Sequence, residues 1–255
     1  MPHISYSELK KWDFCPFYHK LTYVDKIKIF EGNVYTAFGT ALHETCEKLA
    51  LNESINYEST FNDSFKKEIE KLKDIPEEHK PLLTDMKIQG LELASMVLYA
   101  LKIKFPGYKV VSSEEQIMTP IDDIDTEYNF KGFLDLVLKT PDGKYHIIDW
   151  KTCSWGWDIE RKTDKITTYQ LTYYKNFFCK KHHIDPTMVE TYFGLLKRTA
   201  KKNKIEIFRV SSGPRKIKNA LNILNKAEKN INKKNYPKNL LKCGKCEFNK
   251  SKWCP

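Results

Sequence analysis

Residues 131–152, KGFLDLVLKTPDGKYHIIDWKT, predict a β-hairpin that the rest of the chain surrounds. Side chains alternate between apolar and polar in 133–139 and again in 144–151, which is typical of two strands. Between them lies Pro141-Asp142-Gly143, in which proline sets a type I turn and glycine takes the left-handed position of the following bulge. The sequence therefore predicts a three-residue hairpin loop with a defined register.

This register determines which side chains meet across the hairpin. Counting back from the loop, Thr140 faces Lys144 and Asp135 faces Asp149. Directly opposed side chains have Cβ atoms roughly 5 Å apart, where two like charges are destabilising unless a positive charge lies between them. The predicted geometry favours a divalent cation between the two aspartates.

Lys151 adds a positive charge to the same face, because side chains in a strand repeat every second residue. Hard cations such as Mg²⁺ and Mn²⁺ take oxygen ligands, and a neighbouring ammonium group can position a water molecule or stabilise charge that develops on a phosphate. Asp135, Asp149 and Lys151 together suffice for metal-assisted hydrolysis of a phosphodiester. A solvated hairpin, whose charges only keep it soluble, explains the bare pattern equally well.

Several motifs occur in the order of a known family. They are Gly132-Phe133-Leu134-Asp135, Asp149-Trp150-Lys151, Gln170-x-x-x-Tyr174 and, upstream, FGTALH at 38–43. They resemble the G-x-x-D, D/E-x-K and Q-x-x-x-Y motifs and the histidine-bearing helix of the RecB-like branch of the PD-(D/E)XK nuclease superfamily. The resemblance spans 5–254. It implies that metal is bound by His43, Asp135, Asp149 and the backbone carbonyl of Trp150, and that Lys151 positions the attacking water or stabilises the transition state.

His43, Glu115, Gln170 and Tyr174 have weaker support from the residues themselves. A lone histidine beside an apolar helix stripe is more often a core or surface residue than a ligand. In a strand over 108–118, Glu115 and its neighbour point to opposite sides, and we expect Glu115 to face the site. Gln170 and Tyr174 share one helix face, from which they can reach phosphates or orient catalytic groups. Plain solvent exposure of the glutamates and core packing of Tyr174 are the alternatives.

The element order predicts one α/β domain over 1–255, with a central mixed β-sheet flanked by helices. The resemblance implies a restriction-endonuclease-like core. Residues 53–105 are helix-forming sequence broken at Pro76 and Pro81, and we expect a helical insertion there. Further strands are expected at 191–197 and 205–210, and helices at 38–51, 165–181 and 215–235. Gly39-Thr40 is expected to start the first of these helices.

The cysteines near the two ends predict a second site. In the tail segment 240–255, Cys243-Gly244-Lys245-Cys246 is followed by Cys254, and a C-x-x-C suits two thiolates on one metal or cluster. Cys15 ends a short helix capped by Ser5 or Ser7, because Pro16 disfavours helical geometry in the residue before it. Position alone favours a small buried hydrophobe for Cys15.

The resemblance implies more for these cysteines. It extends to the iron–sulfur subgroup that includes AddB and the CRISPR-associated RecB-like exonucleases, in which a fourth cysteine at the position of Cys15 completes a 4Fe-4S site with Cys243, Cys246 and Cys254. That subgroup has a shorter spacing between its last two cysteines than the seven residues, 247–253, found here. Zinc is therefore the alternative, since thiolates suit both.

Charge and composition favour a nucleic-acid partner. The formal net charge of +10 and a pI near 9.0 favour binding to phosphates, which releases counterions. Basic clusters at 197–198, 201–204, 215–218 and 233–234 form either a groove wall or a solvated face.

No apolar run approaches the ~20 residues of a membrane span. Seven cysteines, an odd number, favour metal binding or burial over disulfides, so we expect a cytoplasmic protein without membrane contact.

The predicted function is a metal-dependent deoxyribonuclease that uses Mg²⁺ or Mn²⁺ on single strands or strand ends. An exonuclease in recombination, repair, replication or CRISPR-type DNA processing is expected. Because the sequence has no helicase motif, a helicase or recombination protein is a possible partner. The alternative is a nucleic-acid-binding protein that keeps the fold without turnover, against which the intact set of ligands argues. A cluster-containing redox protein would leave the carboxylates and the basic charge unexplained.

Overall fold

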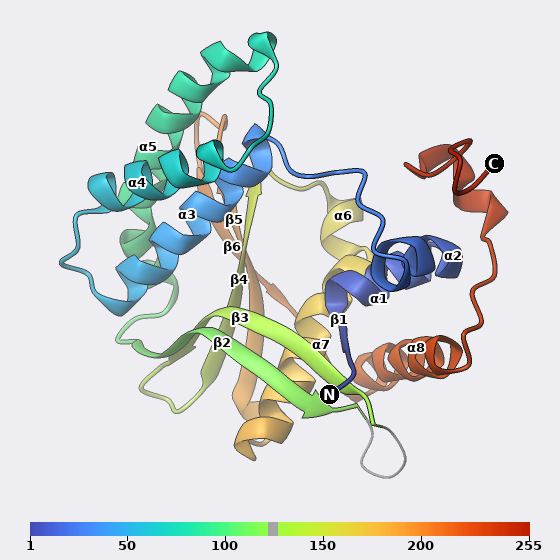
Figure 1. Cartoon of the computed structure of the whole chain (residues 1–255). Helices are drawn as coiled ribbons and strands as arrows, with labels where there is room; N and C mark the ends of the chain where they lie inside the picture. Colours follow the sequence, from blue (N-terminus) through green and yellow to red (C-terminus); the bar gives the residue numbers. More distant parts are fainter. Residues whose placement is uncertain (122–126) are drawn as a thin grey trace.

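The computed structural model describes residues 1–121 and 127–255, and its centre is a six-stranded mixed β-sheet with helices on both faces (Figure 1). The strands are β1 (His3–Ser5), β2 (Lys109–Pro120), β3 (Asn129–Lys139), β4 (Tyr145–Cys153), β5 (Val189–Lys197) and β6 (Ile205–Val210). Their order is β1-β3-β4-β5-β6, with β2 paired to β3. The predicted α/β fold with a central mixed sheet is confirmed.

β3 has three neighbouring strands, and this arrangement opens the sheet. β2 runs antiparallel along its whole length. On the opposite edge, β1 pairs in parallel with residues 129–131, while β4 pairs antiparallel with residues 136–139. Residues 132–135 therefore have no strand partner on that edge in the described part of the chain.

The loop between β3 and β4 confirms the predicted hairpin. The Thr140 N–H donates to the Lys144 carbonyl at 3.0 Å, and Gly143 has a φ of 84°, the left-handed value expected for the bulge. The antiparallel ladder ends one pair before Asp135 and Asp149. The same register places these two residues opposite each other, where the strands begin to part.

Beyond the hairpin, β4 pairs with β5 in parallel over its full length, and β5 pairs with β6 antiparallel. The strands predicted at 191–197 and 205–210 are confirmed, with β5 beginning two residues earlier than expected. A parallel and an antiparallel neighbour on the two sides of β5 make the sheet mixed. β4 thus remains supported by β5 after it has left β3.

Helices α3 (Val34–Leu51), α4 (Tyr57–Glu70) and α5 (Lys80–Lys104) cover one face of the sheet (Figure 1). They bury Phe38, Phe61 and Met86 together with Trp150 of β4. α4, the short η2 (Glu77–His79) and α5 occupy the segment predicted as a helical insertion, and they share this core with the sheet. Pro81 does not break α5, because it lies in the first turn, where its missing N–H costs no hydrogen bond.

α3 begins earlier than the sequence indicated. The Asn33 side chain accepts the Thr36 N–H at 3.0 Å, and the Thr36 hydroxyl accepts the Asn33 N–H at 2.9 Å, which is a capping box. Gly39 therefore lies inside the helix and does not start it. A Cβ at Gly39 would lie 3.0 Å from Thr152 Oγ1, so this glycine lets α3 approach β4 closely.

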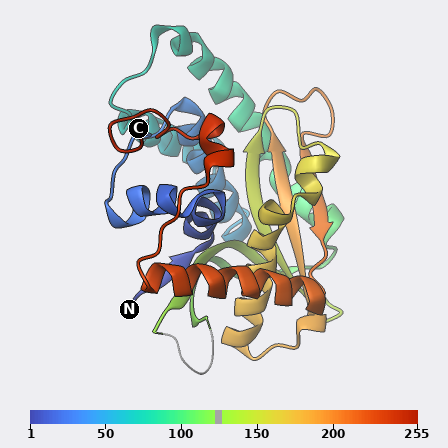
Figure 2. The ribbon, with the colours of Figure 1, turned by 90° about the vertical axis from the view of Figure 1, so that its right-hand side faces the viewer.

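Helices α1 (Tyr6–Phe14), α7 (Lys165–His182) and α8 (Pro214–Asn232) cover the other face, with α8 outermost (Figure 2). The Ser5 hydroxyl accepts the Glu8 N–H at 3.2 Å, which confirms Ser5 as the N-cap of α1. α7 contacts β3, β4 and β5 and buries Tyr173, Phe177 and Phe178. α7 therefore packs against the opening between β3 and β4 from this face of the sheet.

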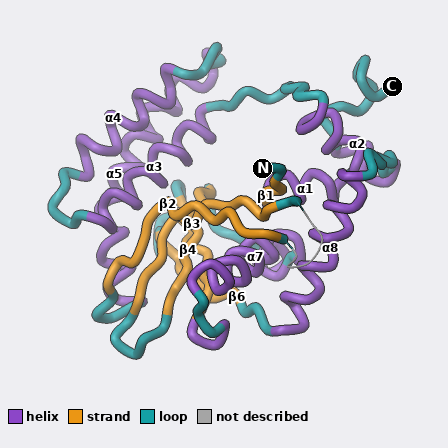
Figure 3. The backbone as a smooth tube through the Cα atoms, turned by 60° about the horizontal axis from the view of Figure 1, so that its bottom comes forward, coloured by secondary structure: helices purple, strands orange, loops and turns teal. Residues whose placement is uncertain are grey.

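The short helices that follow α1 and the C-terminal tail lie side by side (Figure 3). α2 (Pro16–His19) and the π-helical turn η1 (Lys20–Val24) follow α1, and the tail with η4 (Leu240–Lys245) returns to them. The Phe17 N–H donates to the Pro237 carbonyl at 3.3 Å, and Asn239 Nδ2 donates to the Phe14 carbonyl at 3.0 Å. The short helices α6 (Ile159–Thr163) and η3 (Pro186–Met188) complete the elements.

Among the described residues, no helix has the length and apolar character needed to cross a membrane.

Gly194 on β5 provides the space for the Trp150 ring. A Cβ at this position would lie 2.3 Å from Trp150 Cε3, and the ring is fully buried. We expect Gly194→Ala to destabilise the protein by about 1–3 kcal/mol through overpacking, measured as a lower melting temperature. Gly244→Ala is the control, because an added Cβ there meets no atom within 4 Å. Equal melting temperatures for the two variants would contradict this account of the packing.

Candidate active site

The candidate site is centred on the opening between β3 and β4. Where the backbone ladder stops, the Trp150 N–H donates to Asp135 Oδ2 at 2.7 Å. The N–H and C=O of one residue in an extended strand point to the same edge, so the Trp150 carbonyl also faces the opening. The Asp135 side chain thus replaces a backbone acceptor that β3 no longer provides.

Asp149 is almost completely buried, with 1% of its surface exposed. Lys151 Nζ lies 2.6 Å from Asp149 Oδ2, and Gln170 Nε2 donates to Asp149 Oδ1 at 2.8 Å. Gln170 Nε2 also donates to the Tyr174 hydroxyl oxygen at 3.1 Å. The structure therefore brings both motifs together, and it places Gln170 and Tyr174 behind Asp149, where they fix its orientation.

Gly132 lies in the unpaired stretch of β3, three residues before Asp135. A Cβ at Gly132 would lie 2.8 Å from Tyr174 Cε1, closer than side chains approach one another. Only a glycine lets α7 come this near to β3. The G-x-x-D spacing therefore combines a residue that makes room for Tyr174 with one that terminates the β-ladder.

α3 brings a histidine and a glutamate to the opening. His43 Nδ1 lies 3.7 Å from Asp135 Oδ2, too far for a hydrogen bond. One ligand atom each from His43, Glu47 and Asp135 lies within 4.8 Å of the others. Ligand atoms around one Mg²⁺ are roughly 3 to 4 Å apart, because each lies about 2.1 Å from the ion, so this donor set fits a divalent cation. Burial and the nearby Lys151 charge lower the pKa of His43 to about 4, which leaves its imidazole neutral and able to bind metal.

Negative charge at the opening is costly without a cation. Burial raises the pKa of Asp135 and of Asp149 to about 6, although the Lys151 ammonium opposes the shift. Burial and the neighbouring carboxylates of Glu114 and Asp135 raise the pKa of Glu47 to about 9. The site therefore concentrates acids that a divalent cation would stabilise in their charged forms.

The structure places Glu114 rather than Glu115 beside the site, which corrects the expected orientation. Glu115 Oε1 lies 2.6 Å from Lys181 Nζ and 2.5 Å from His182 Nε2, so it is held against α7. Glu114 is hydrogen-bonded to Glu47. β2 shifts register near its start, and Glu114 has a φ of 50°. Strand alternation in the sequence reveals neither irregularity.

Glu47 and Glu114 were missed by the sequence reasoning, although one of them left a signal. Glu47 follows His43 by four residues, the spacing that places two side chains on one helix face. A second metal-binding side chain could have been sought at that position. Glu114 left no comparable signal, because its orientation depends on the local backbone of β2.

Four cysteines meet where the N-terminal helices and the tail pack together. Cys15, Cys243, Cys246 and Cys254 line one small pocket, whose other walls include Phe14, Phe17 and Phe248. In addition, the Asn239 N–H donates to Cys15 Sγ at 3.3 Å. The structure therefore brings the four sequence-predicted cysteines from both ends of the chain to one place.

The four sulfur atoms of this cysteine pocket are not tightly clustered. Within 1–121 and 127–255, no three of them lie within 4.8 Å of one another. Thiolates around a single zinc ion, each at about 2.3 Å in tetrahedral geometry, are roughly 3.8 Å apart. The arrangement is thus more open than one zinc ion requires.

The basic clusters of the C-terminal quarter do not gather into one groove. Lys197 Nζ lies 3.3 Å from Glu206 Oε2, and the Arg198 guanidinium donates to Gln89 at 2.7 Å, so both side chains are used within the fold. The cluster at 215–218 belongs to α8, which is the outermost helix of the layer formed by α1, α7 and α8 (Figure 2). The wall expected from these clusters is therefore not continuous.

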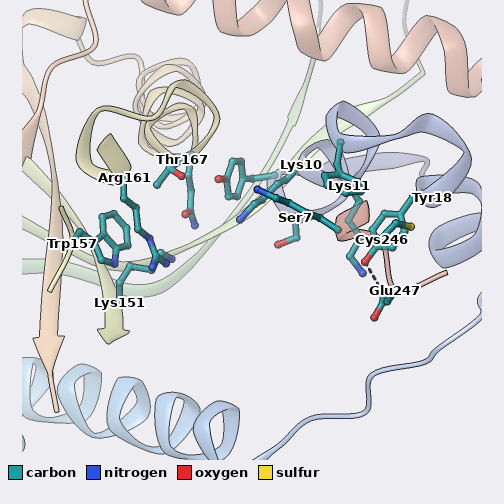
Figure 4. A pocket seen from close by; sticks show the side chains of 14 residues that line it. Ser7, Lys10, Lys11, Tyr18, Lys151, Trp157, Arg161, Thr167, Cys246 and Glu247 are labelled. Atoms are coloured by element: carbon teal, nitrogen blue, oxygen red, sulfur yellow. Dashed lines mark hydrogen bonds between the residues drawn. The ribbon is translucent and has the colours of Figure 1, made fainter. Parts of the chain in front are cut away.

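A different set of cations faces the site. A pocket of about 730 Å³ extends from Lys151 towards the tail, and Lys10, Lys11, Arg161 and Lys245 line it (Figure 4). A second pocket of about 500 Å³ reaches Lys151 from the side of α3. Lys151 is thus accessible from two directions.

Comparisons with known proteins found one family model and several solved structures that resemble this chain. A model of the PD-(D/E)XK nuclease superfamily matches residues 3–255. The crystal structure of a "Putative exonuclease" from Eubacterium rectale is similar over 91% of this chain and 79% of that chain, with a TM-score of 0.57 and 14% identity. The crystal structure of SSO0001 is 17% identical, with a TM-score of 0.39 over 94% of this chain and 91% of that chain. No curated protein sequence matches the chain.

Asp135→Asn is expected to stabilise the metal-free protein at pH 7.5. The pKa of Asp135 is raised to about 6 in the folded protein, above its value in an unfolded chain. Its contribution to the free energy of unfolding therefore falls as pH rises through this range, and at pH 7.5 the ionised side chain costs on the order of 1–3 kcal/mol. The neutral amide removes this cost, so the melting temperature in chelator should rise, and the gain should shrink near pH 4.

Asp142→Asn in the exposed hairpin loop is the matched control. A hydrogen bond from Thr140 lowers the pKa of Asp142, so its replacement should not stabilise the protein at pH 7.5. Thermal denaturation of both variants in EDTA at the two pH values provides the measurement. An Asp135→Asn protein no more stable than wild type at pH 7.5 would contradict the account.

Proposed function

The chain belongs to the PD-(D/E)XK nuclease superfamily, and from the geometry of its opening we propose that it is a metal-dependent deoxyribonuclease. One observation carries the proposal: His43, Glu47 and Asp135 offer ligand atoms within 4.8 Å of one another at the opening, and the Asp149 carboxylate and the Lys151 ammonium group lie beside them. Hydrolysis of a phosphodiester with a divalent cation uses such a set. The buried negative charge supports binding of Mg²⁺ or Mn²⁺.

The proposed metal ligands are His43, Asp135, Asp149 and the backbone carbonyl of Trp150, with Glu47 as an additional ligand. The neutral imidazole of His43 offers a lone pair, and the carboxylates offer the oxygens that hard cations prefer. Gln170 holds Asp149 in position through Oδ1. When bound, the cation supplies Lewis-acid stabilisation of a phosphate oxygen and lowers the pKa of a water molecule.

Lys151 is proposed to act as a charged group and not as a general base. Burial works against its charge, but Asp149 and Asp135 outweigh this effect and raise the pKa of Lys151. The side chain therefore stays an ammonium group at neutral pH. In that form it can hold the attacking water in place or stabilise negative charge on the phosphate.

The proposed substrate is a single DNA strand or a strand end, with exonucleolytic cleavage in recombination, repair, replication or CRISPR-type processing. The cations that line the pocket beside Lys151 support a strand as ligand, because they neutralise phosphates whatever the base sequence. The similar Eubacterium rectale protein, which is described as an exonuclease, supports the same class of reaction. Duplex opening would require a helicase or recombination partner. Free cysteines and a DNA substrate favour the cytoplasm.

Asp149→Ala and Lys151→Ala are each expected to lower cleavage of end-labelled single-stranded DNA by about 100-fold or more. One removes a proposed metal ligand and the other the charge beside it, while folding and DNA retention remain. Glu115→Gln is the control, because this carboxylate is paired with Lys181 and His182 away from the opening. It should cleave at the wild-type rate in the same assay with Mg²⁺ or Mn²⁺.

Two results would overturn the proposed mechanism. One is wild-type cleavage in the absence of any divalent cation, and the other is an Asp149→Ala protein as active as wild type. A wild-type protein that binds DNA but cleaves it with neither metal would support a nucleic-acid-binding protein without turnover.

We further propose that Cys15, Cys243, Cys246 and Cys254 hold a 4Fe-4S cluster, with zinc as the alternative. The convergence of four thiols from both ends of the chain supports a shared site. Their open spacing favours a cluster, which is larger than a single ion and is held by the same donors. The aromatic walls of the pocket would limit access of water to it. Such a site would join α1 to the tail.

Replacement of Cys15 tests this joint site. A link between residues 15 and 243 closes a long loop, which the chain-entropy model values at roughly 5 kcal/mol, comparable to the stability of a whole domain. Cys15→Ala should lose iron and acid-labile sulfide, and both α1 and the tail should become sensitive to limited proteolysis. Cys153 lies outside the cysteine pocket, so the Cys153→Ala protein should keep its iron and sulfide and should stay resistant to limited proteolysis.

Metal analysis of anaerobically purified protein distinguishes the two cofactors. Iron with equimolar sulfide supports the cluster, whereas zinc without sulfide supports the alternative. Full metal content and unchanged protease resistance in Cys15→Ala would show that Cys15 is an ordinary buried thiol.

A further inference from the structure

Arg161, on the short helix α6, lies over an aromatic ring at the edge of the pocket. Its guanidinium carbon is 4.5 Å from the centre of the Trp157 ring. Trp157 is only 7% exposed and packs edge-on against Phe193 and Phe208 in the core. A stacked guanidinium on a platform fixed by the core is pre-organised, so it loses little freedom when it binds a ligand.

The Arg161 guanidinium faces Lys151, and none of the described residues is an acidic partner for it. Figure 4 shows the two side chains next to each other on the wall of the pocket. In the described part of the chain, no carboxylate oxygen lies within 4.0 Å of the Arg161 guanidinium. The next residue, Lys162, is bonded to Glu206 of β6 instead. Two neighbouring positive groups repel each other, and an anion bound between or beside them relieves this repulsion.

Lys10 of α1 brings a third positive charge to the same pocket from another element. It too has no carboxylate within 4.0 Å among the described residues. Burial, together with the charges of Arg161 and Lys151, lowers the pKa of Lys10, so the three groups sense one another. Cations from β4, α6 and α1 thus converge on one space. Lys151 is paired with Asp149 and Glu247 also lines the pocket, whereas Arg161 and Lys10 have no such pairing among the described residues.

The size of the pocket limits what the anion can be. Its volume of about 730 Å³ is within the range that holds a small organic ligand. A few nucleotides of one strand fit such a space, and a double helix does not. Figure 4 shows Lys151 and Arg161 together at one part of the pocket wall, with Lys10 farther along it.

We propose that Arg161 is a phosphate-positioning residue, which binds the phosphate next to the scissile one on a single DNA strand, and that Lys10 binds the phosphate beyond it. This inference rests on the proposed nuclease function, because it defines the scissile phosphate as the one at Lys151. The planar guanidinium donates two parallel N–H groups to one phosphate, a geometry that an ammonium group cannot match. The Trp157 ring holds the guanidinium in the orientation for this contact.

Binding is measured by fluorescence anisotropy with a labelled oligothymidylate in Ca²⁺, over several salt concentrations. Arg161→Ala is expected to raise Kd about tenfold or more and to reduce the slope of log K against log salt by about 0.7, the value for one phosphate of a single strand. Arg161→Lys should recover the slope but only part of the affinity. Lys162→Ala is the matched control and should leave both unchanged, because its side chain is bonded to Glu206.

Oligothymidylates that carry a single uncharged methylphosphonate linkage locate the contact. At one position the modification should weaken wild-type binding by about the same factor as Arg161→Ala, and at that position it should have no further effect on the variant. This non-additivity is the signature of two groups that contact each other. Two results would overturn the inference. One is an Arg161→Ala protein with the affinity and salt slope of the wild type, and the other is additive effects of Arg161→Ala and the methylphosphonate at every linkage tested.

Steady-state cleavage separates this inference from the proposed function. Arg161→Ala should raise KM more than it lowers kcat, because the residue binds a phosphate that does not react. A wild-type protein that shows the predicted binding pattern but never cleaves would refute the nuclease and keep the phosphate contact. A protein that cleaves normally, with Arg161→Ala equal to wild type in both KM and salt slope, would refute only the role of Arg161.

Discussion

A carboxylate that takes the place of a backbone carbonyl holds the candidate site open. Asp135 accepts the Trp150 N–H at 2.7 Å where β3 and β4 part, so the strands diverge without leaving a buried donor unpaired. This divergence admits α7, whose Gln170 reaches Asp149, and α3, whose His43 approaches Asp135. A carbonyl acceptor in the same place would extend the ladder and close the sheet.

The same arrangement makes the metal-free site electrostatically unfavourable. Asp135 and Asp149 lie beside each other in a buried environment, and Lys151 compensates their charge only in part, since the pKa of both aspartates stays near 6. Glu47 adds a further acid whose pKa is raised to about 9. These groups cost stability in the metal-free protein, and their presence at one opening agrees with a role in binding a cation.

Local rules in the sequence were sufficient for much of this arrangement. The turn chemistry of Pro141 and Gly143 fixed the hairpin register, which determined that Asp135 faces Asp149. Features that depend on contacts between distant segments or on local irregularity could not be predicted. The short β1 leaves no periodic signal, the backbone of β2 rotates Glu114 rather than Glu115 towards the site, and the stacking of Arg161 on Trp157 requires β5 and β6 to fix the ring.

The central claim is that the opening between β3 and β4 binds a divalent cation. Anomalous diffraction from a crystal of the wild-type protein soaked in Mn²⁺ tests it most directly, because the signal locates the metal without reference to activity. The account predicts a peak within about 2.5 Å of His43 Nδ1 and of Asp135 and Asp149 carboxylate oxygens. A well-ordered soaked crystal with no peak at these residues, or with manganese bound only elsewhere, would contradict it.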